Sequence, residues 1–99
     1  MSLRALVLFI ALGASALAGA QEASQTRLVA ANCANCHGTD GRSQGGMPAL
    51  TGLSRDFIVS QMQDFKAGKR PATIMHQLSK GYTDAEIDAL AAYFSALKN

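Results

Sequence analysis

The sequence predicts an all-α protein of about four helices. Apolar residues recur at helical spacing in four segments of the 99-residue chain, and residues typical of helix starts and helix ends border these segments. No segment shows the alternation of apolar and polar residues that is typical of a strand. The four segments are residues 24–34, 55–67, 72–79 and 84–97.

The first twenty residues have the pattern of a secretory signal peptide. A short start with one positive side chain, Arg4, leads into an apolar run that extends to about Leu17, and small residues follow at Ala18 and Ala20. The run is short for a membrane span of about 20 apolar residues, so we expect cleavage after Ala20 rather than a retained anchor. The mature chain, residues 21–99, is then expected to form one small domain in the periplasm, with no stable membrane insertion.

The first predicted helix has Leu28, Val29 and Ala31 as its apolar positions, with Ala30 and Ala31 small enough for close contact with another helix, and it is expected to end at Gly38. In the stretch that follows, residues 37–52, Gly38, Gly41, Gly45 and Gly46 break any periodic pattern. A loop of this length in a small domain is usually functional or packed on something, and the edge of a bound group would give it such a surface.

The other helices carry start and end signals of their own. Ser54 is expected to cap the helix over residues 55–67, and Gly68 is a natural residue to follow its end. Thr83 and Glu86 have the spacing of a capping box at the start of the last helix. The apolar positions of these three helices are Phe57, Ile58, Met62, Phe65, Ile74, Met75, Leu78, Ile87, Leu90, Ala91, Phe94 and Leu97.

The chemistry of the chain centres on Cys33, Cys36 and His37, which form a C-x-x-C-H run. This run is the attachment pattern of c-type haem, in which two thiols add to the vinyl groups and the histidine binds the iron through Nε2. Both cysteines of the chain lie in it. One covalently attached haem c would also complete the small apolar core that a domain of this size can build.

Two other uses of paired cysteines fit the chain less well. A structural zinc site needs four ligands, and His76 is the only further soft candidate. A thioredoxin-like redox site expects a βαβ pattern, which the sequence lacks. The formal net charge is only +2, and basic residues alternate with acidic ones, so the sequence predicts no binding to nucleic acid.

A haem that transfers electrons needs a second axial ligand, and the mature chain offers four candidates: Met47, Met62, Met75 and His76. Met62 lies in the middle of a predicted helix, where packing is the simpler explanation. Met47 follows His37 by only ten residues, so its loop would have to cross the haem edge. Met75 follows a whole helix and has ample reach, so we favour it, with His76 as the second choice and otherwise a surface histidine.

Two further contacts to the haem group are expected. The second ring N–H of His37 needs an acceptor, and a backbone carbonyl at Pro48 is the candidate, although Pro48 could also do no more than stiffen a turn. The anionic propionates need basic partners, and an ordinary solvated basic turn is the alternative for those residues. The candidates for the propionates are Arg70, Lys69, Arg55 and Lys80.

Several stretches together resemble the class I cytochromes c. They are residues 33–38, 47–52, 61–70 and 83–94. The run over residues 73–82 is similar in particular to the cytochrome subunit of flavocytochrome c sulfide dehydrogenase. The resemblance covers nearly the whole mature chain, and the residues around Met75 are its more discriminating part.

The resemblance implies a cytochrome c fold around one haem, with the first and last helices crossed and packed. It also implies His37 and Met75 as the axial ligands, and the Pro48 carbonyl as the acceptor for the His37 ring. Some subunits of this kind carry two haem domains. This chain has one C-x-x-C-H run, and it therefore resembles a monohaem form.

The resulting hypothesis is single-electron transfer with no substrate turned over on this chain. The resemblance implies an FAD-containing sulfide dehydrogenase subunit as the electron donor. A free soluble shuttle to a terminal oxidase or another acceptor is the main alternative. A haem module that binds a ligand, with Met75 away from the iron, and a thiol or zinc module without haem are the others.

Overall fold

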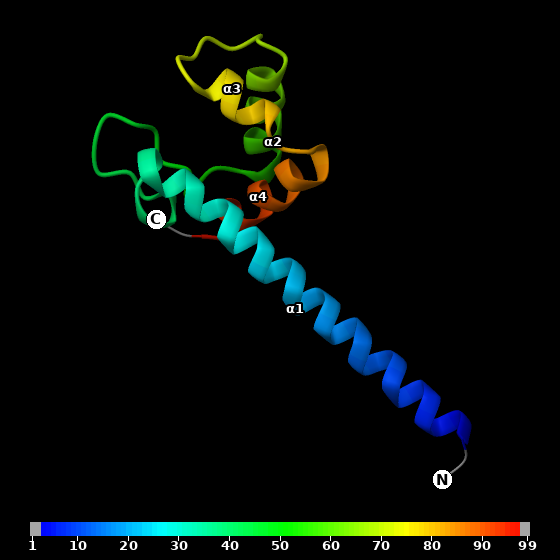
Figure 1. Cartoon of the computed structure of the whole chain (residues 1–99). Coiled ribbons are helices and arrows are strands. Elements are labelled where there is room, and N and C mark those ends of the chain that lie inside the picture. The colour runs from blue at the N-terminus through cyan, green and yellow to red at the C-terminus, as the bar shows by residue number, and fades with distance from the viewer. Residues whose placement is uncertain (1–2, 98–99) are drawn as a thin grey trace.

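The computed structural model describes the backbone of residues 3–97 and the side chains of residues 18–97. In this part of the chain no strand occurs, and the predicted all-α class is confirmed. Four α-helices and one short 3-10 helix follow one another (Figure 1): α1 Leu3–His37, η1 Thr39–Gly41, α2 Arg55–Lys66, α3 Met75–Lys80 and α4 Asp84–Ala96.

Helix α1 is much longer than the predicted helix over residues 24–34. It runs from Leu3 to His37, and its N-terminal half projects from the rest of the molecule (Figure 1). Leucine and alanine, both strong helix formers, dominate the sequence before residue 24, and this explains the extension. The predicted signal peptide, residues 1–20, lies largely outside the residues whose side chains are described, so its cleavage stays a prediction. Over residues 18–97, no helix combines the length and the apolar character needed to cross a membrane.

The core lies where α1, α2 and α4 meet. Helix α4 packs on both α1 and α2, so the packing of the first helix on the last that the resemblance implies is present. Several partly buried apolar side chains surround the core, among them Cys33 and Met62. The buried members of the core cluster are Ala30, Ile58, Leu90, Ala91 and Phe94.

The apolar face predicted for the first helix is wrong in two of its three positions. Leu28 is 70% exposed and Ala31 is exposed, whereas Ala30 is 5% exposed and Val29 is half-buried. Positions three and four apart share a helix face, so the buried Ala30 and the half-buried Val29 both lie over Cys33. Leu28 lies roughly 200° around the helix from Ala30 and therefore faces away from α4.

The caps predicted for α2 and α4 are present. The Ser54 hydroxyl accepts a hydrogen bond from the Phe57 N–H at 3.1 Å, and α2 ends one residue before its predicted end. Thr83 and Glu86 form the complete capping box, with bonds of 3.1 Å and 2.9 Å in the two directions. Gly68, after α2, has a φ of +73°, as the end signal predicted.

Helix α3 begins three residues later than predicted and extends one residue further. It starts at Met75 after Ile74, which has no side-chain capping bond. The β-branched Thr73 and Ile74 are poor residues with which to begin a helix, and this fits the delayed start. Helix α3 packs on α2, where the fully buried Ser79 hydroxyl lies 3.8 Å from the Met62 sulfur and donates to it.

Candidate functional site

The last turn of α1 carries both cysteines and the histidine of the C-x-x-C-H run. Cys36 and His37 lie three and four residues after Cys33, so the three side chains share one face of the helix. Cys33 is half-buried against the core, and this burial raises the pKa of its thiol, while Cys36 is exposed. The two cysteines are not joined to each other by a disulfide. The helix therefore presents two thiols and an imidazole together, one thiol anchored in the core and the other open to solvent.

Gly38 ends this helix and turns the chain into the following loop. Its φ is +86°, and a Cβ there would lie 3.1 Å from the backbone of Ser43. Its N–H donates to the Ala34 carbonyl at 3.1 Å. Only glycine can adopt this positive φ and also fit this close to the Ser43 backbone without strain. The position of His37 at the end of α1 therefore depends on Gly38.

The His37 ring is held by the loop that follows. Its Nδ1 lies 2.6 Å from the Pro48 carbonyl oxygen. A carbonyl only accepts hydrogen bonds, so Nδ1 carries the ring proton and donates it. The lone pair of the neutral ring is then on Nε2, which is the nitrogen that a c-type attachment would use.

The loop that contains Pro48 is itself fastened to α4. The Leu50 N–H donates to the Gly41 carbonyl at 2.8 Å, and Gly41 is buried. The Tyr93 hydroxyl donates to the Asp40 carboxylate at 3.4 Å. Sequence reasoning missed this second contact because its partners are far apart in the chain and neither carries a local signal. The Pro48 carbonyl thus belongs to an ordered loop.

The three methionines of the mature domain lie in different surroundings. Met62 packs against the core and accepts the hydrogen bond from Ser79. Met47 is 42% exposed and directly precedes Pro48. Met75 is half-buried at the first position of α3. The packing explanation therefore describes Met62 well, whereas Met47 and Met75 take no part in the core.

His76 is not the surface histidine that the sequence suggested. It is half-buried, and its Nε2 is hydrogen-bonded to the Arg70 carbonyl. Its ring also lies beside the Phe65 ring, with 6.3 Å between the centroids. The nitrogen that most often binds metals is therefore occupied, because it carries the proton that the carbonyl accepts.

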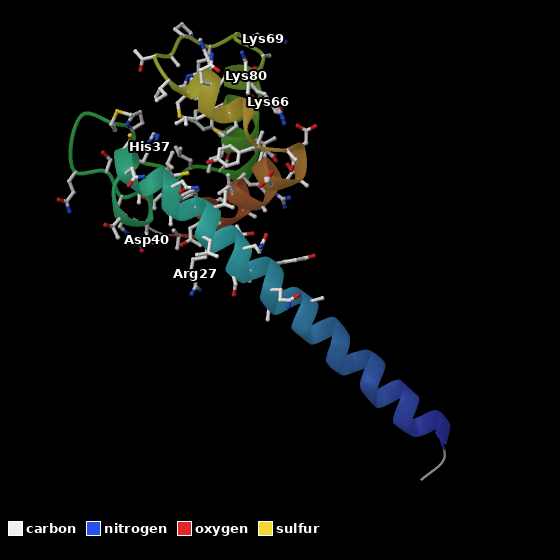
Figure 2. All side chains as sticks on the ribbon, viewed as in Figure 1. Arg27, His37, Asp40, Lys66, Lys69 and Lys80 are labelled. Carbon is white, nitrogen blue, oxygen red and sulfur yellow. The ribbon has the colours of Figure 1, made fainter. Side chains whose placement is uncertain are left out.

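Arg70 lies on the same part of the molecule as Met75. Its guanidinium carbon is 4.7 Å from the centroid of Phe65, the distance of a cation–π contact. Figure 2 shows Lys66, Lys69 and Lys80 around the α2–α3 pair, while His37 ends α1. Lys66 is engaged, with its Nζ 2.6 Å from the Tyr82 carbonyl oxygen.

The structure thus brings some of the predicted site residues together and keeps others apart. Cys33, Cys36, His37 and Pro48 form one group at the end of α1. Met75 and Arg70 belong to a second group on α3 and the segment before it, and α3 packs on α2. The two groups are connected through the packing of α2 and α1 on α4.

The residues present fit a covalently bound haem. The thiols and the imidazole are the donors that such a group needs, and the imidazole has the correct tautomer. The buried apolar core is small, with six such side chains over the part of the chain whose side chains are described. Four large apolar side chains of the loop, α2, α3 and the residue before α3 are 42–51% exposed, as expected where a large apolar body packs: Met47, Phe57, Ile74 and Leu78.

Comparison with known proteins gives the same result. A family model described as Cytochrome c matches residues 22–98. The cytochrome subunit of sulfide dehydrogenase from Chlorobaculum tepidum is 42% identical over 74 residues, which are 75% of this chain and 67% of that protein. Cytochrome c4 from Pseudomonas aeruginosa is 37% identical over 92% of this chain and 46% of its own length.

A solved structure of cytochrome c4 from Acidithiobacillus ferrooxidans has a similar fold. The TM-score is 0.63 at 40% sequence identity, over 66% of this chain and 38% of that one. This chain therefore spans less than half the length of the cytochromes c4 that it matches. With the family model covering nearly all of residues 21–99, the chain belongs to the cytochrome c family and is an electron carrier with covalently bound haem c.

Proposed function

We propose that this chain is a periplasmic monohaem cytochrome that accepts single electrons from an FAD-containing sulfide dehydrogenase subunit. Residues 1–20 are removed as a signal peptide on export. In the remaining domain Cys33 and Cys36 bind the haem covalently, and His37 and Met75 are the axial ligands of the iron. When bound, the haem supplies a one-electron Fe(III)/Fe(II) couple.

The contact between His37 and Pro48 carries the assignment of the ligands. Since the Pro48 carbonyl is 2.6 Å from Nδ1, the loop at residue 48 lies behind the His37 ring, on the side away from Nε2. Met47 is attached directly to Pro48 and is therefore held on that same side. A second protein ligand to the iron would have to come from the Nε2 side of the His37 ring, which Met47 cannot reach without breaking this contact.

The other candidates are engaged elsewhere. The sulfur of Met62 accepts a hydrogen bond from the buried Ser79, and the Nε2 of His76 donates to the Arg70 carbonyl. Met75 is the candidate that remains. It stands at the start of α3, with the exposed apolar side chains of Ile74 before it and Leu78 one turn after it. A thioether in this position raises the reduction potential relative to a second imidazole.

Arg70 is proposed to contact a haem propionate. Its guanidinium carbon lies 4.7 Å from the centroid of the Phe65 ring, and a guanidinium carries five N–H donors. The contact with Phe65 holds the side chain in place, which lowers the entropy cost of binding an anion. Lys69 and Lys80, both exposed on the same part of the molecule, add positive charge there.

Substitution of each methionine tests the ligands. We expect Met75→Ala to abolish the weak long-wavelength absorption of methionine-ligated ferric haem, to lower the reduction potential and to allow carbon monoxide to bind the ferrous protein. Met47→Ala and Met62→Ala are the controls and should keep the absorption. Loss of the absorption in Met47→Ala alone would show that the assignment is wrong.

The proposed partner rests on a named relative. The protein from Chlorobaculum tepidum is the cytochrome subunit of a sulfide dehydrogenase, and the present chain spans 67% of it. A flavin can take two electrons from a reduced sulfur compound and pass them on one at a time, which suits a one-electron carrier.

Co-purification tests the partner. The haem-loaded chain, expressed with an affinity tag in its own cells, should co-purify with a flavin-containing protein. Addition of sulfide to the purified complex should then reduce the haem. A tagged Leu28→Ala variant is a suitable control, because Leu28 is exposed and lies far from Met75. If the chain purifies without any flavoprotein, and sulfide with cell extract leaves the haem oxidised, the free-shuttle alternative replaces this part of the proposal.

A further inference from the structure

The beginning of α3 lacks the local contacts that usually fix a helix start. Ile74 stands in the N-cap position with φ −120° and ψ −21° and makes no side-chain capping bond. The helix has six residues, too few to be stable by itself. By contrast, α2 and α4 each begin with a side-chain cap. The first residue of α3 is Met75, so an unfixed start would leave its thioether poorly placed.

His76, the second residue of α3, supplies the missing attachment. Its Nε2–H donates to the carbonyl of Arg70, in the irregular segment before the helix. Its ring lies beside Phe65 of α2, 6.3 Å between centroids and inclined by 57°. The guanidinium of Arg70 lies over the Phe65 ring as well, with 4.7 Å from its carbon to the ring centroid. One imidazole therefore connects α3, the preceding segment and α2.

The far end of α3 is fixed separately. Ser79 is fully buried and donates to the sulfur of Met62 on α2. Two attachments to α2, at His76 and Ser79, are enough to fix both the position and the rotation of a six-residue helix. Around the helix Met75 lies about 100° from His76 and about 40° from Ser79, so the two attachments together set the direction of its side chain.

We propose that His76 is a positioning residue for Met75: its bond to the Arg70 carbonyl and its contact with Phe65 fix the first turn of α3 and aim the thioether at the iron. The inference depends on the ligand assignment proposed above. It gives a role to a histidine that the haem ligands leave unused. It also explains why Arg70, Phe65 and His76 gather at a helix start that has no side-chain cap.

Three variants of the haem-loaded protein test the inference. His76→Phe keeps a ring beside Phe65 but removes the N–H donor. His76→Gln keeps a donor near the position of Nε2. Gln77→Ala is the matched control, because Gln77 is the exposed neighbour on the same helix. The readouts are the long-wavelength absorption of the ferric protein and the dissociation constant of added imidazole, which competes with Met75 for the iron.

We expect His76→Phe to weaken the absorption and to bind imidazole about tenfold more tightly, because one such hydrogen bond is worth roughly a factor of ten in an equilibrium. His76→Gln should return both readouts most of the way to the wild-type values, and Gln77→Ala should leave them unchanged. Wild-type readouts in His76→Phe would overturn the inference, and so would equal losses in His76→Phe and His76→Gln.

The Met75→Ala protein separates this inference from the ligand assignment. If Met75→Ala keeps the absorption, the assignment itself is wrong. If Met75→Ala loses it while His76→Phe behaves as wild type, Met75 remains the ligand and only the role of His76 is rejected. Helix content measured by circular dichroism on each variant shows whether a change is confined to the haem ligands. A His76→Phe protein that has lost its overall helix content, while His76→Gln keeps wild-type readouts, still supports the role of the donor.

Discussion

The two halves of the site are built in different ways. The His37 half, formed by the end of α1, the loop over residues 38–53 and α4, is surrounded by buried apolar side chains and by side-chain and backbone hydrogen bonds. The Met75 half, formed by α3 and residues 67–74, has large exposed apolar side chains and an uncapped helix. The first half makes many contacts within the chain, whereas the second is attached mainly through the packing of α3 on α2.

This difference matches the chemistry that each half performs. Covalent attachment through Cys33 and Cys36 needs thiols at a defined spacing on a formed helix, and the His37 half provides this. With Met75 as the proposed ligand, a thioether that binds iron weakly and reversibly would let the Met75 half be completed after attachment. The predictions below test this division, beginning with the largest expected effect.

Removal of the haem should affect the Met75 half most. In Cys33→Ser/Cys36→Ser, which cannot attach haem, we expect amide protection in α3 to fall at least about tenfold more than in α4, because α3 has few buried contacts of its own. Hydrogen exchange of the two proteins, followed by mass spectrometry, measures this. An equal loss of protection in the two helices would show that the halves form one cooperative unit.

Gly41→Ala should damage the His37 half. Gly41 has a φ of +73°, and a Cβ there would lie 2.9 Å from the Leu50 Cβ and 3.0 Å from the Phe94 ring. We expect a loss of about 3 kcal/mol in the free energy of unfolding, from the unfavourable backbone and the crowded core together. Denaturant unfolding of the haem-loaded protein measures it.

Gly45→Ala is the control for this substitution. A Cβ at Gly45 would have no atom within 4 Å, and its φ is not positive. Its effect on the free energy of unfolding should stay within about 0.5 kcal/mol. A similar loss in both variants would mean that the loop tolerates no side chain at all, and the close approach of Gly41 to Leu50 and Phe94 would not be the cause.

Substitution of a residue at a helix start should lower the stability in one half and not in the other, by less than Gly41→Ala does. Thr83→Ala removes the capping box of α4 and should cost about 1 kcal/mol. Thr73→Ala, before the uncapped α3, should change the stability by less than about 0.5 kcal/mol. Thermal unfolding of both variants gives the comparison, and an equal cost would show that Thr73 contributes to the start of α3 after all.

Acid should produce the smallest effect. The carboxylate of Asp84 accepts from the Gln63 side-chain amide at 2.9 Å and lies 3.5 Å from the Lys66 ammonium, and these contacts lower its pKa. A lowered folded pKa gives stability that is present above the ordinary value of 3.8 and is lost as the pH falls through the folded value. The group is 79% exposed, so the contribution is small.

The difference between wild type and Asp84→Asn isolates this contribution. Thermal midpoints measured between neutral pH and about pH 3 should show a gap between the two proteins that narrows as the solution becomes acidic. Haem ligation and the other carboxylates change in both proteins alike, so they cancel in the difference. A gap that widens toward low pH would contradict the lowered pKa of Asp84.

The sequence was most informative where a structural signal is local. Thr83 and Glu86 are three residues apart, and one turn of helix brings them into contact, so the capping box could be predicted with its bonds. Gly38 and Gly68 marked the ends of helices for the same reason. The C-x-x-C-H run likewise acts within little more than one turn of helix.

The sequence was less informative where position depends on distant contacts. Leu28 is more apolar than Ala30, yet Ala30 is the buried residue, because it lies on the side of α1 that packs on α4. At the start of α3 the His76 ring donates to the backbone carbonyl of Arg70. Every residue has such a carbonyl, so no sequence pattern predicts this bond. The choice of Met75 as a ligand was made from its reach along the chain and from the family resemblance, not from a local rule, and it stays a prediction.

The acceptor for the His37 ring N–H is also a main-chain oxygen, and this limits how substitutions during evolution can alter the site. A carboxylate in the same place could be lost by a single substitution, and the basicity of the ligand would change with it. The oxygen at Pro48 survives replacement of its own side chain, so substitutions there alter only how often the loop holds the oxygen in place. The electronic properties of the iron are in this way protected from mutation, while the loop remains able to vary.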